Sequence, residues 1–298
     1  MKTNKSTLTL NFMKINSKLL ISIFFLLFII KLKAQVVNDS ILIDGHYRTF
    51  HFNLPLKNST NASLIFILHG SGGNGIKSMK STSKLLDIAN KENLLILFPD
   101  GYLKNWNECR KNAPAAANVE NIDENLFFSK MIDYCSSKYF INQKKVFAIG
   151  TSGGGHMVYK LAMTMPDKFK AITAIVANLP EANNMDCVEK KMPIAVMIVN
   201  GTNDKTNPYN GGISAKKKGL VVSTEDTFHY WATVNGYNGE PKKEDLPDLE
   251  PDGKTIEKYT YLQKGKPEVV LLKVVNGEHN NPKDIDVFLE SWNFFKRQ

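Results

Sequence analysis

Several hallmarks of other protein classes are missing from this sequence of 298 residues. The apolar run from Leu19 to Ile30 would rise only about 18 Å as a helix, whereas the core of a bilayer is about 30 Å thick. Cysteine is scarce, with 3 residues, and no spacing of cysteine and histidine resembles a zinc site. No internal repeat or low-complexity linker divides the chain. These absences, together with 43% hydrophobic and 22% charged residues, exclude a polytopic membrane protein, a collagen-like fibre and a disordered chain.

Basic residues are in excess, but most of the excess lies in one segment. The formal net charge is +9, from 38 Lys and Arg against 29 Asp and Glu. Residues 1–34 contain six lysines and no acidic residue, so 32 basic and 29 acidic groups remain after them, a net charge of +3. We therefore expect no nucleic-acid partner, and we expect the run Lys216–Lys218 to form a solvated loop.

The N-terminal segment has the layout of a secretory signal peptide. Lysines precede the apolar run, and Ala34 follows it at a position suited to cleavage. We expect residues 1–34 to be the signal, with Met13 as an alternative start, and residues 35–298 to form a single domain. The mature protein would then be secreted or periplasmic, without stable insertion in the membrane. The alternative is an N-terminal anchor that is not cleaved.

The three cysteines make an odd number, which in an exported chain suggests one disulfide and one buried thiol. Cys135 belongs to a helical pattern of apolar residues that includes Met131 and Ile132, so it is typical of a core position. Cys109 and Cys187 are left as the expected bridge.

Short apolar runs alternate with amphipathic segments after residue 35. Runs that are almost continuously apolar are typical of parallel strands buried on both faces. We expect a single α/β domain, with a mostly parallel central sheet and helices on both of its faces. We also expect an antiparallel hairpin over 41–54 and a polar surface loop over 238–253. The expected strands are 63–68, 94–98, 146–149, 171–177, 194–199 and 269–275, and the expected helices are 78–90, 121–139, 156–165, 224–235 and 285–295.

The segment Gly150-Thr151-Ser152-Gly153-Gly154 lies between an expected strand and an expected helix. This is the context of a nucleophile elbow, in which a tight turn lifts the serine hydroxyl clear of the sheet. Glycines are needed two residues before and two after the serine, because side chains there would clash with the neighbouring strand or helix. Ser152 is therefore the candidate nucleophile, and the alternative is a glycine-rich turn without chemistry.

A second glycine-rich segment, Leu68-His69-Gly70-Ser71-Gly72-Gly73, follows an apolar strand. In folds with a nucleophile elbow, a loop at this place donates a backbone N–H to an oxyanion, and the residue after the nucleophile donates the second. Gly153 would supply that second N–H. A phosphate-binding turn is the alternative, although the segment lacks the Lys-Ser/Thr ending of a P-loop. We expect His69 to steady the loop.

The acid and the base of such a site should follow later strands. Asp204 comes directly after the expected strand 194–199, whereas the rivals Asp186 and Asp226 precede that strand or lie in a helical pattern. Among the 6 histidines, His279 alone follows the last expected strand. The order Ser152, Asp204, His279 matches the nucleophile–acid–base order of the α/β-hydrolases.

Together these segments resemble the secreted polyhydroxybutyrate depolymerase-like esterases of the α/β-hydrolase fold, which include feruloyl and acetylxylan esterases. The resemblance extends over residues 40–297. It is carried by L-H-G-S-G-G (68–73), F-P-D-G (98–101), N-W-N-E-C (105–109), G-T-S-G-G-G-H-M (150–157), A-N-L-P (177–180), G-T-N-D (201–204) and G-E-H-N-N-P (277–282).

The resemblance implies a catalytic domain over 35–298 in which Ser152, Asp204 and His279 form a catalytic triad. Backbone N–H groups of Ser71 and Gly153 would form the oxyanion hole. The pairing of Cys109 with Cys187 also agrees with the family pattern. No metal and no other cofactor is expected.

The resemblance further implies a serine esterase that works through an acyl-serine intermediate. Its substrates would be feruloyl or acetyl esters of polysaccharides, including plant polysaccharides, or short hydroxyalkanoate esters. Trp106 would lie near the acyl pocket and bind substrate. The family usually has histidine where Asn200 stands. Two other functions stay open: a serine peptidase of the same fold, and a carbohydrate- or lipid-binding protein on a hydrolase scaffold without catalysis.

Overall fold

The computed structural model describes residues 36–54, 60–215 and 218–298. The predicted signal peptide and its cleavage site lie outside these ranges, as do Lys216 and Lys217. Within them, no helix has both the length and the apolar character needed to cross a membrane. The described residues belong to one compact unit.

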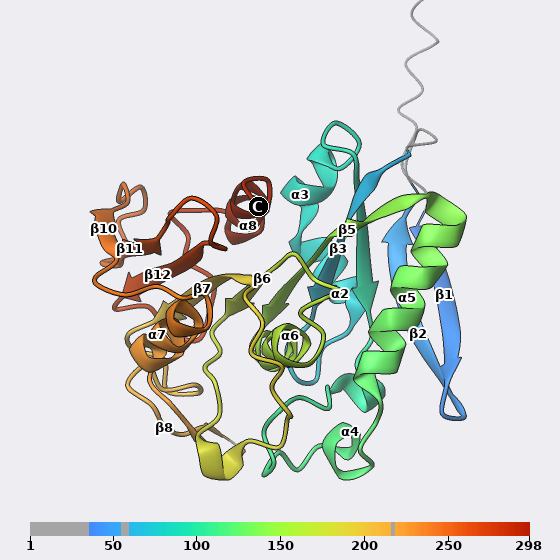
Figure 1. Ribbon diagram of the computed structural model, residues 1–298, viewed down its shortest axis with the longest axis horizontal. Helices are drawn as coiled ribbons and strands as arrows, with labels where there is room; N and C mark the ends of the chain where they lie inside the picture. The colour runs from blue at the N-terminus through green and yellow to red at the C-terminus, as the bar shows by residue number, and fades with distance from the viewer. Residues whose placement is uncertain (1–35, 55–59, 216–217) are drawn as a thin grey trace, which may run out of the picture. The chain divides into compact units, whose positions relative to one another are not determined.

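The centre of this unit is a ten-stranded sheet with parallel strands in its middle (Figure 1). The strands are β1 (Val36–Ile43), β2 (His46–Asn53), β3 (Ala62–Leu68), β4 (Leu94–Pro99), β5 (Ile141–Thr151), β6 (Ala171–Ile175), β7 (Ala195–Gly201), β10 (Lys242–Asp245), β11 (Thr255–Tyr261) and β12 (Val269–Val275). Their order across the sheet is β1-β2-β4-β3-β5-β6-β7-β12-β11-β10. The six from β4 to β12 are parallel, and the two pairs at the edges are antiparallel. The predicted mostly parallel sheet is confirmed.

Helices cover both faces of the sheet (Figure 1). Residues of α5 (Glu124–Tyr139), α6 (Gly153–Thr164) and α7 (Thr224–Val234) pack in one apolar cluster, and those of α2 (Gly75–Ser81), α3 (Ser83–Ile88) and α8 (Val287–Phe295) pack in the other. Strand β3 shows why two layers form, since Phe66 packs against Phe128 of α5 while Ile65 belongs to the opposite cluster. Each such buried side chain contributes about 2 kcal/mol of hydrophobic stabilisation. A short helix α4 (Ala116–Val119) and a small pair of strands, β8 (Gly212–Ile213) and β9 (Leu220–Val221), lie in the connecting segments.

Two expected elements differ from the structure. The helix expected over 78–90 is two helices, because Thr82 leaves helical geometry and its hydroxyl donates to the carbonyls of Ser78 and Met79. The surface loop expected over 238–253 contains the edge strand β10, which pairs with β11, a strand that was not expected. Both strands were missed because they carry charged side chains on exposed faces and therefore lack a continuous apolar run.

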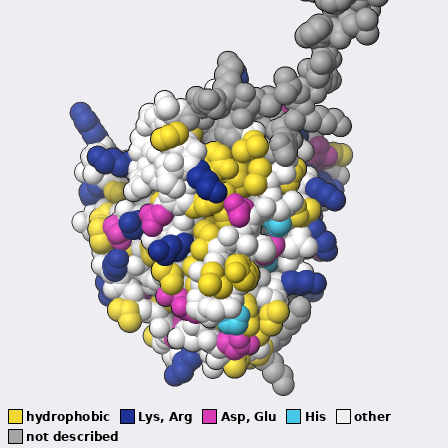
Figure 2. Space-filling model, turned by 90° about the vertical axis from the view of Figure 1, so that its right-hand side faces the viewer, with side chains coloured by type: hydrophobic (Ala, Val, Ile, Leu, Met, Phe, Trp, Pro, Cys, Tyr) yellow, Lys and Arg dark blue, Asp and Glu magenta, His cyan; other side chains and the backbone are white. Residues whose placement is uncertain are grey.

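The opposite edge of the sheet is formed by β1. Figure 2 shows this side of the molecule, where lysine and arginine side chains are scattered among hydrophobic and acidic ones and do not gather in one patch. Leu42 and Tyr47 of the β1–β2 hairpin are exposed hydrophobic residues. The visible face therefore has no concentrated positive surface of the kind that nucleic acids bind.

Candidate active site

Ser152 stands at a strained turn between β5 and α6. Its φ of 55° and ψ of −115° lie in a region that residues other than glycine seldom adopt, and its N–H donates to the carbonyl of Ile175 at 2.8 Å. A Cβ atom on Gly150 would lie 2.0 Å from the carbonyl oxygen of Gly154, and one on Gly154 would lie 2.3 Å from that of Leu68. The turn therefore accepts only glycine at these two positions.

The hydroxyl of Ser152 begins a chain of hydrogen bonds through His279 to Asp204. Ser152 Oγ lies 2.9 Å from His279 Nε2, and His279 Nδ1 lies 2.6 Å from Asp204 Oδ2. The Asp204 side chain is only 1% exposed. Its other oxygen accepts hydrogen bonds from the backbone N–H groups of Thr206 and Asn207, at 2.7 and 2.9 Å. These bonds fix the orientation of the carboxylate toward the imidazole.

Two neighbouring parallel strands bring the acid and the base together. Asp204 follows β7 and His279 follows β12, and the two strands pair in parallel, so their carboxyl ends lie at the same edge of the sheet. The two loops are also joined directly, because the N–H of Asn203 donates to the carbonyl of Gly277 at 2.7 Å. Neither rival acid hydrogen bonds to His279: Asp226 instead accepts from Ser223 at the start of α7.

Asn200 occupies the place where related sequences were expected to have histidine. Its amide is fully buried and donates to the carbonyl of Ala177, to Asn178 Oδ1 and to Thr224 Oγ1. Asparagine thus ties β7 to the segment after β6 and to α7, and the loop that carries Asp204 keeps its anchorage.

The predicted oxyanion donors are the backbone N–H groups of Ser71, which lines the same cavity as Ser152, and of Gly153, which follows Ser152 at the start of α6. Among the described residues, neither N–H has a hydrogen-bond acceptor. The two segments approach closely, since a Cβ atom on Gly153 would lie 2.9 Å from the backbone nitrogen of Ser71.

His69 holds the loop as expected: its Nε2 accepts from the N–H of Gly101 at 2.9 Å, and its Nδ1 lies 2.8 Å from the carbonyl of Gly70. Burial lowers the pKa of His69, which keeps this ring neutral.

Comparisons with known proteins agree with this geometry. The sequence pattern of the prolyl oligopeptidase family matches residues 127–179, which include the turn at Ser152. Feruloyl esterase B of Piromyces equi is 24% identical over 169 residues, and the bifunctional acetylxylan esterase/xylanase XynS20E of Neocallimastix patriciarum is 21% identical over 262 residues. These matches cover 55% and 87% of this chain but 31% and 35% of the two relatives, so the chain spans about a third of their length.

Among solved structures, the acetyl xylan esterase from Aspergillus awamori superimposes with a TM-score of 0.64. The match covers 89% of this chain and 100% of that one, at 15% identity. The chain has the α/β-hydrolase fold. Its resemblance to the feruloyl and acetylxylan esterases, predicted from the motifs, is confirmed by these relatives.

Trp106, which the resemblance placed near the acyl pocket, is buried against the loop that carries Ser71 and is absent from the lining of the cavity beside Ser152. Its side chain is 3% exposed, and its indole N–H donates to the carbonyl of His69 at 2.9 Å. The ring packs against His69 and Phe128, with centroids 4.9 and 6.1 Å apart. Trp106 therefore supports the loop that carries Ser71 through this hydrogen bond, and its contact with substrate stays a prediction.

A cavity of about 370 Å³ opens beside Ser152. Sequence reasoning did not single out most of its wall: His156 lies within the motif at 150–157, and the other missed residues come from loops outside the quoted motifs. Lys218, from the run expected to form a solvated loop, donates from Nζ to Ser71 Oγ at 2.9 Å. The cavity is lined by Gly70, Ser71, Arg110, Ser152, His156, Thr206, Asn207, Ala215, Lys218 and His279.

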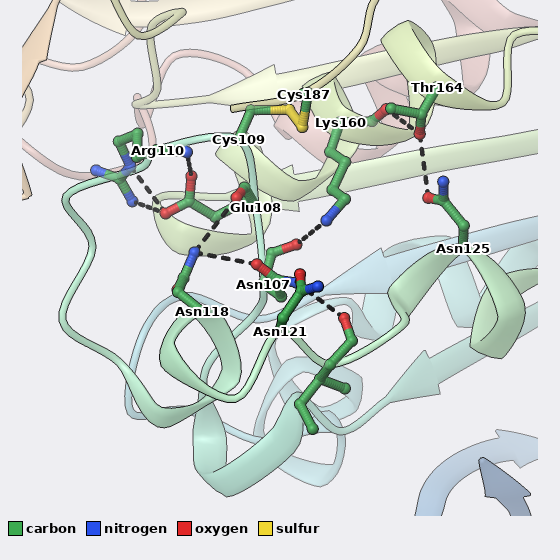
Figure 3. Close-up of a disulfide and its surroundings, with 11 residues drawn as sticks. Asn107, Glu108, Cys109, Arg110, Asn118, Asn121, Asn125, Lys160, Thr164 and Cys187 are labelled. Atoms are coloured by element: carbon green, nitrogen blue, oxygen red, sulfur yellow. Dashed lines mark hydrogen bonds and ion pairs between the residues drawn. A yellow bond between two sulfur atoms is a disulfide. The ribbon is translucent and has the colours of Figure 1, made fainter. Parts of the chain in front are cut away.

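A disulfide anchors the segment that carries Arg110 (Figure 3). Cys109 is bonded to Cys187, with Cα atoms 5.1 Å apart. Next to it, Arg110 donates from Nε and Nη2 to Glu108 Oε1, at 2.8 and 2.7 Å, and both side chains are almost fully buried. The remaining cysteine, Cys135, is buried and free, and burial raises the pKa of its thiol. Within the described ranges, no group of His, Cys, Asp and Glu is arranged to hold a metal ion.

Proposed function

We propose that the protein is a serine esterase in which Ser152 is the nucleophile. The observation that carries the proposal is the continuous hydrogen-bond chain from Ser152 Oγ through His279 to Asp204, at 2.9 and 2.6 Å. A serine hydroxyl is a weak nucleophile unless a base removes its proton, and a histidine at this distance can do so. The esterase relatives support the same chemistry.

In the proposed mechanism, His279 Nε2 takes the proton of Ser152 as Oγ attacks the acyl carbon. Asp204 orients the imidazole and stabilises its charged form, while the N–H groups of Ser71 and Gly153 stabilise the oxyanion. His279 then protonates the departing alcohol. In the second step the same imidazole activates a water molecule, which releases the acid from the acyl-serine.

The proposed substrates are feruloyl or acetyl esters of polysaccharides, or short hydroxyalkanoate esters. Support for the first two comes from the names of the relatives, which are feruloyl and acetylxylan esterases. We also propose that the protein acts outside the cytoplasm, after removal of the segment 1–34, because that segment has the layout of a secretory signal.

A peptidase activity is the second candidate, because the prolyl oligopeptidase family matches residues 127–179. This match covers the elbow and the elements around it, which esterases and peptidases of one fold share. A panel of methyl ferulate, acetylated xylan, hydroxybutyrate oligomers and a proline-containing dipeptide anilide separates the two. Cleavage of esters alone supports the esterase, and cleavage of the anilide at a comparable rate supports the peptidase.

The variant Ser152→Ala tests the proposal, with Ser137→Ala on the exposed end of α5 as the matched control. We expect Ser152→Ala to reduce hydrolysis of p-nitrophenyl acetate by roughly 10⁴-fold or more and to abolish labelling by a fluorophosphonate. Circular dichroism should not change, because the substitution keeps the Cβ atom. Full activity of Ser152→Ala would remove Ser152 from the mechanism, and an unlabelled, folded wild type would favour the binding protein.

A further inference from the structure

We propose that the cavity beside Ser152 binds a carboxylate group, so that the hydrolase prefers esters with a free carboxylate close to the scissile bond. The inference rests on the proposed esterase function and adds a substrate class to it. Three observations support it: the charge of the cavity wall, its unpaired polar atoms, and its position relative to Ser152.

The wall of the cavity carries two cations and no acidic side chain. Arg110 and Lys218 line it, and its members include no Asp or Glu. The carboxylate of Glu108 accepts hydrogen bonds from Nε and Nη2 of Arg110 and balances the charge of the guanidinium. Among the described residues, the third nitrogen, Arg110 Nη1, has no acceptor. Lys218 adds an ammonium group to the wall, and Arg110 Nη1 remains as a donor for an anion. Guanidinium and ammonium groups are the usual protein partners of a carboxylate.

The same wall contains buried polar atoms that no described residue satisfies. His156 Nδ1 and both amide atoms of Asn207 lack a hydrogen-bond partner, although the two residues are only 4% and 3% exposed. Buried polar atoms without partners are rare in folded proteins and call for a ligand or water. The Asn207 amide can donate to one carboxylate oxygen while Lys218 or Arg110 holds the other.

His156 adds no competing charge. Burial lowers its pKa well below the usual value, and the positive charges of Arg110 and Lys218 lower it further. The ring is therefore neutral, and Arg110 and Lys218 line the same cavity. Its Nδ1 has no hydrogen-bond partner among the described residues, and a neutral imidazole can offer this nitrogen as an acceptor to a hydroxyl next to the carboxylate.

The position of Lys218 places the anion near the reacting bond. Its Nζ donates to Ser71 Oγ at 2.9 Å, and the backbone N–H of Ser71 is one of the two proposed oxyanion donors. A volume of about 370 Å³ is at the small end of ligand cavities, which suits a short acid. Apart from the two imidazoles, the cavity wall contains no aromatic side chain on which a phenolic ring could stack.

The experiment compares charged esters with neutral ones of nearly the same shape. One arm places the carboxylate on the acyl side and compares monomethyl succinate with dimethyl succinate. The kcat/KM of dimethyl succinate is divided by two, because this compound has two equivalent ester groups. The other arm places it on the alcohol side, with acetoxyacetate against its methyl ester. We expect kcat/KM to be at least about tenfold higher for the charged member of one arm, and the preference to shrink with added salt.

The variant Lys218→Met probes the cation, with Lys111→Met as the control, because Lys111 is exposed and outside the cavity wall. The ratio of the two kcat/KM values within one preparation does not depend on how much of the enzyme is folded. We expect Lys218→Met to lose the preference, Lys111→Met to keep it, and Lys218→Arg to restore most of it. Equal ratios in Lys218→Met and Lys111→Met would overturn the assignment.

Failure of this inference can be distinguished from failure of the esterase proposal. If neutral esters are cleaved as fast as the charged ones in both arms, the enzyme is an esterase but the cavity does not select carboxylates. If no ester is cleaved and no fluorophosphonate label is taken up, the esterase proposal fails. Calorimetric binding of succinate then tests the cavity without turnover: binding that Lys218→Met weakens supports the carboxylate site, and absence of binding refutes it.

Discussion

A buried ion pair between β2 and α5 gives a stability prediction that can be worked out from the structure. Arg48 Nη2 lies 2.8 Å from Glu124 Oε2, and the two side chains are 2% and 0% exposed. Glu124 Oε1 also accepts from the backbone N–H of Asn107, in the segment that leads to Arg110. The pair therefore connects β2 and α5 to the segment that lines the cavity.

Removal of Arg48 leaves the carboxylate of Glu124 buried without its partner. We expect Arg48→Met to lower the free energy of unfolding by about 3–5 kcal/mol at pH 7, which for a domain of this size lowers Tm by roughly 10 °C. The double variant Arg48→Met/Glu124→Leu has no buried charge and should recover most of the loss. Lys84→Met, which removes an exposed lysine from a 3.8 Å surface pair, should cost less than about 1 kcal/mol.

The effect should depend on pH in a defined direction. Burial raises the pKa of Glu124, and Arg48 opposes this rise. Without Arg48, the pKa of Glu124 in the folded state rises further above its value in the unfolded chain. Protonation of Glu124 therefore stabilises the folded variant fully below the unfolded-state pKa, and this stabilisation is lost as the pH rises through the folded-state pKa. Thermal unfolding followed by circular dichroism should therefore show the Arg48→Met deficit shrinking from pH 7 to pH 4.5. A single variant as stable as wild type, or a double variant no better than the single, would refute the reasoning.

Three further predictions concern the acid of the triad, the disulfide and a buried carboxylate. Asp204→Asn should lower kcat for p-nitrophenyl acetate by about 10⁴-fold with little change in fold, and a loss below tenfold would contradict its role. Replacing both Cys109 and Cys187 by serine opens a loop of 78 residues and should cost about 4 kcal/mol in urea unfolding, whereas unchanged stability would contradict a bridge. Burial alone would raise the pKa of Asp100, but hydrogen bonds from His51 and two further donors bring it to about 2. The ionised Asp100 should contribute about 1 kcal/mol to the free energy of unfolding, after allowance for its partial exposure. Wild type should lose this contribution as the pH falls from 5 to 2, and Asp100→Asn should lack it at every pH.

The meeting of Ser152, Asp204 and His279 could be predicted because the position of each obeys a local rule. Ser152 has glycines where a tight turn leaves no room for side chains, and a Cβ at 2.0 Å from a carbonyl shows how strict this rule is. Asp204 and His279 follow apolar strands, and parallel strands deliver their carboxyl ends to one edge of the sheet.

The wall of the cavity could not be predicted, since it is assembled by tertiary contacts. Arg110 reaches it through a disulfide and an ion pair, and Lys218 through a contact with Ser71 across 147 residues of chain. Trp106 shows a related limit. The resemblance placed Trp106 near the acyl pocket, but the direction of its ring is set by a hydrogen bond to the carbonyl of His69, which no sequence pattern reveals.

The most direct measurement is capture of the acyl-enzyme. Wild-type protein mixed with p-nitrophenyl acetate, quenched with acid at short times and digested, should carry an acetyl group on the peptide that contains Ser152, at a stoichiometry matching the burst of p-nitrophenol. Acetylation at another residue, or turnover with no acetylated peptide at any time, would contradict nucleophilic attack by Ser152.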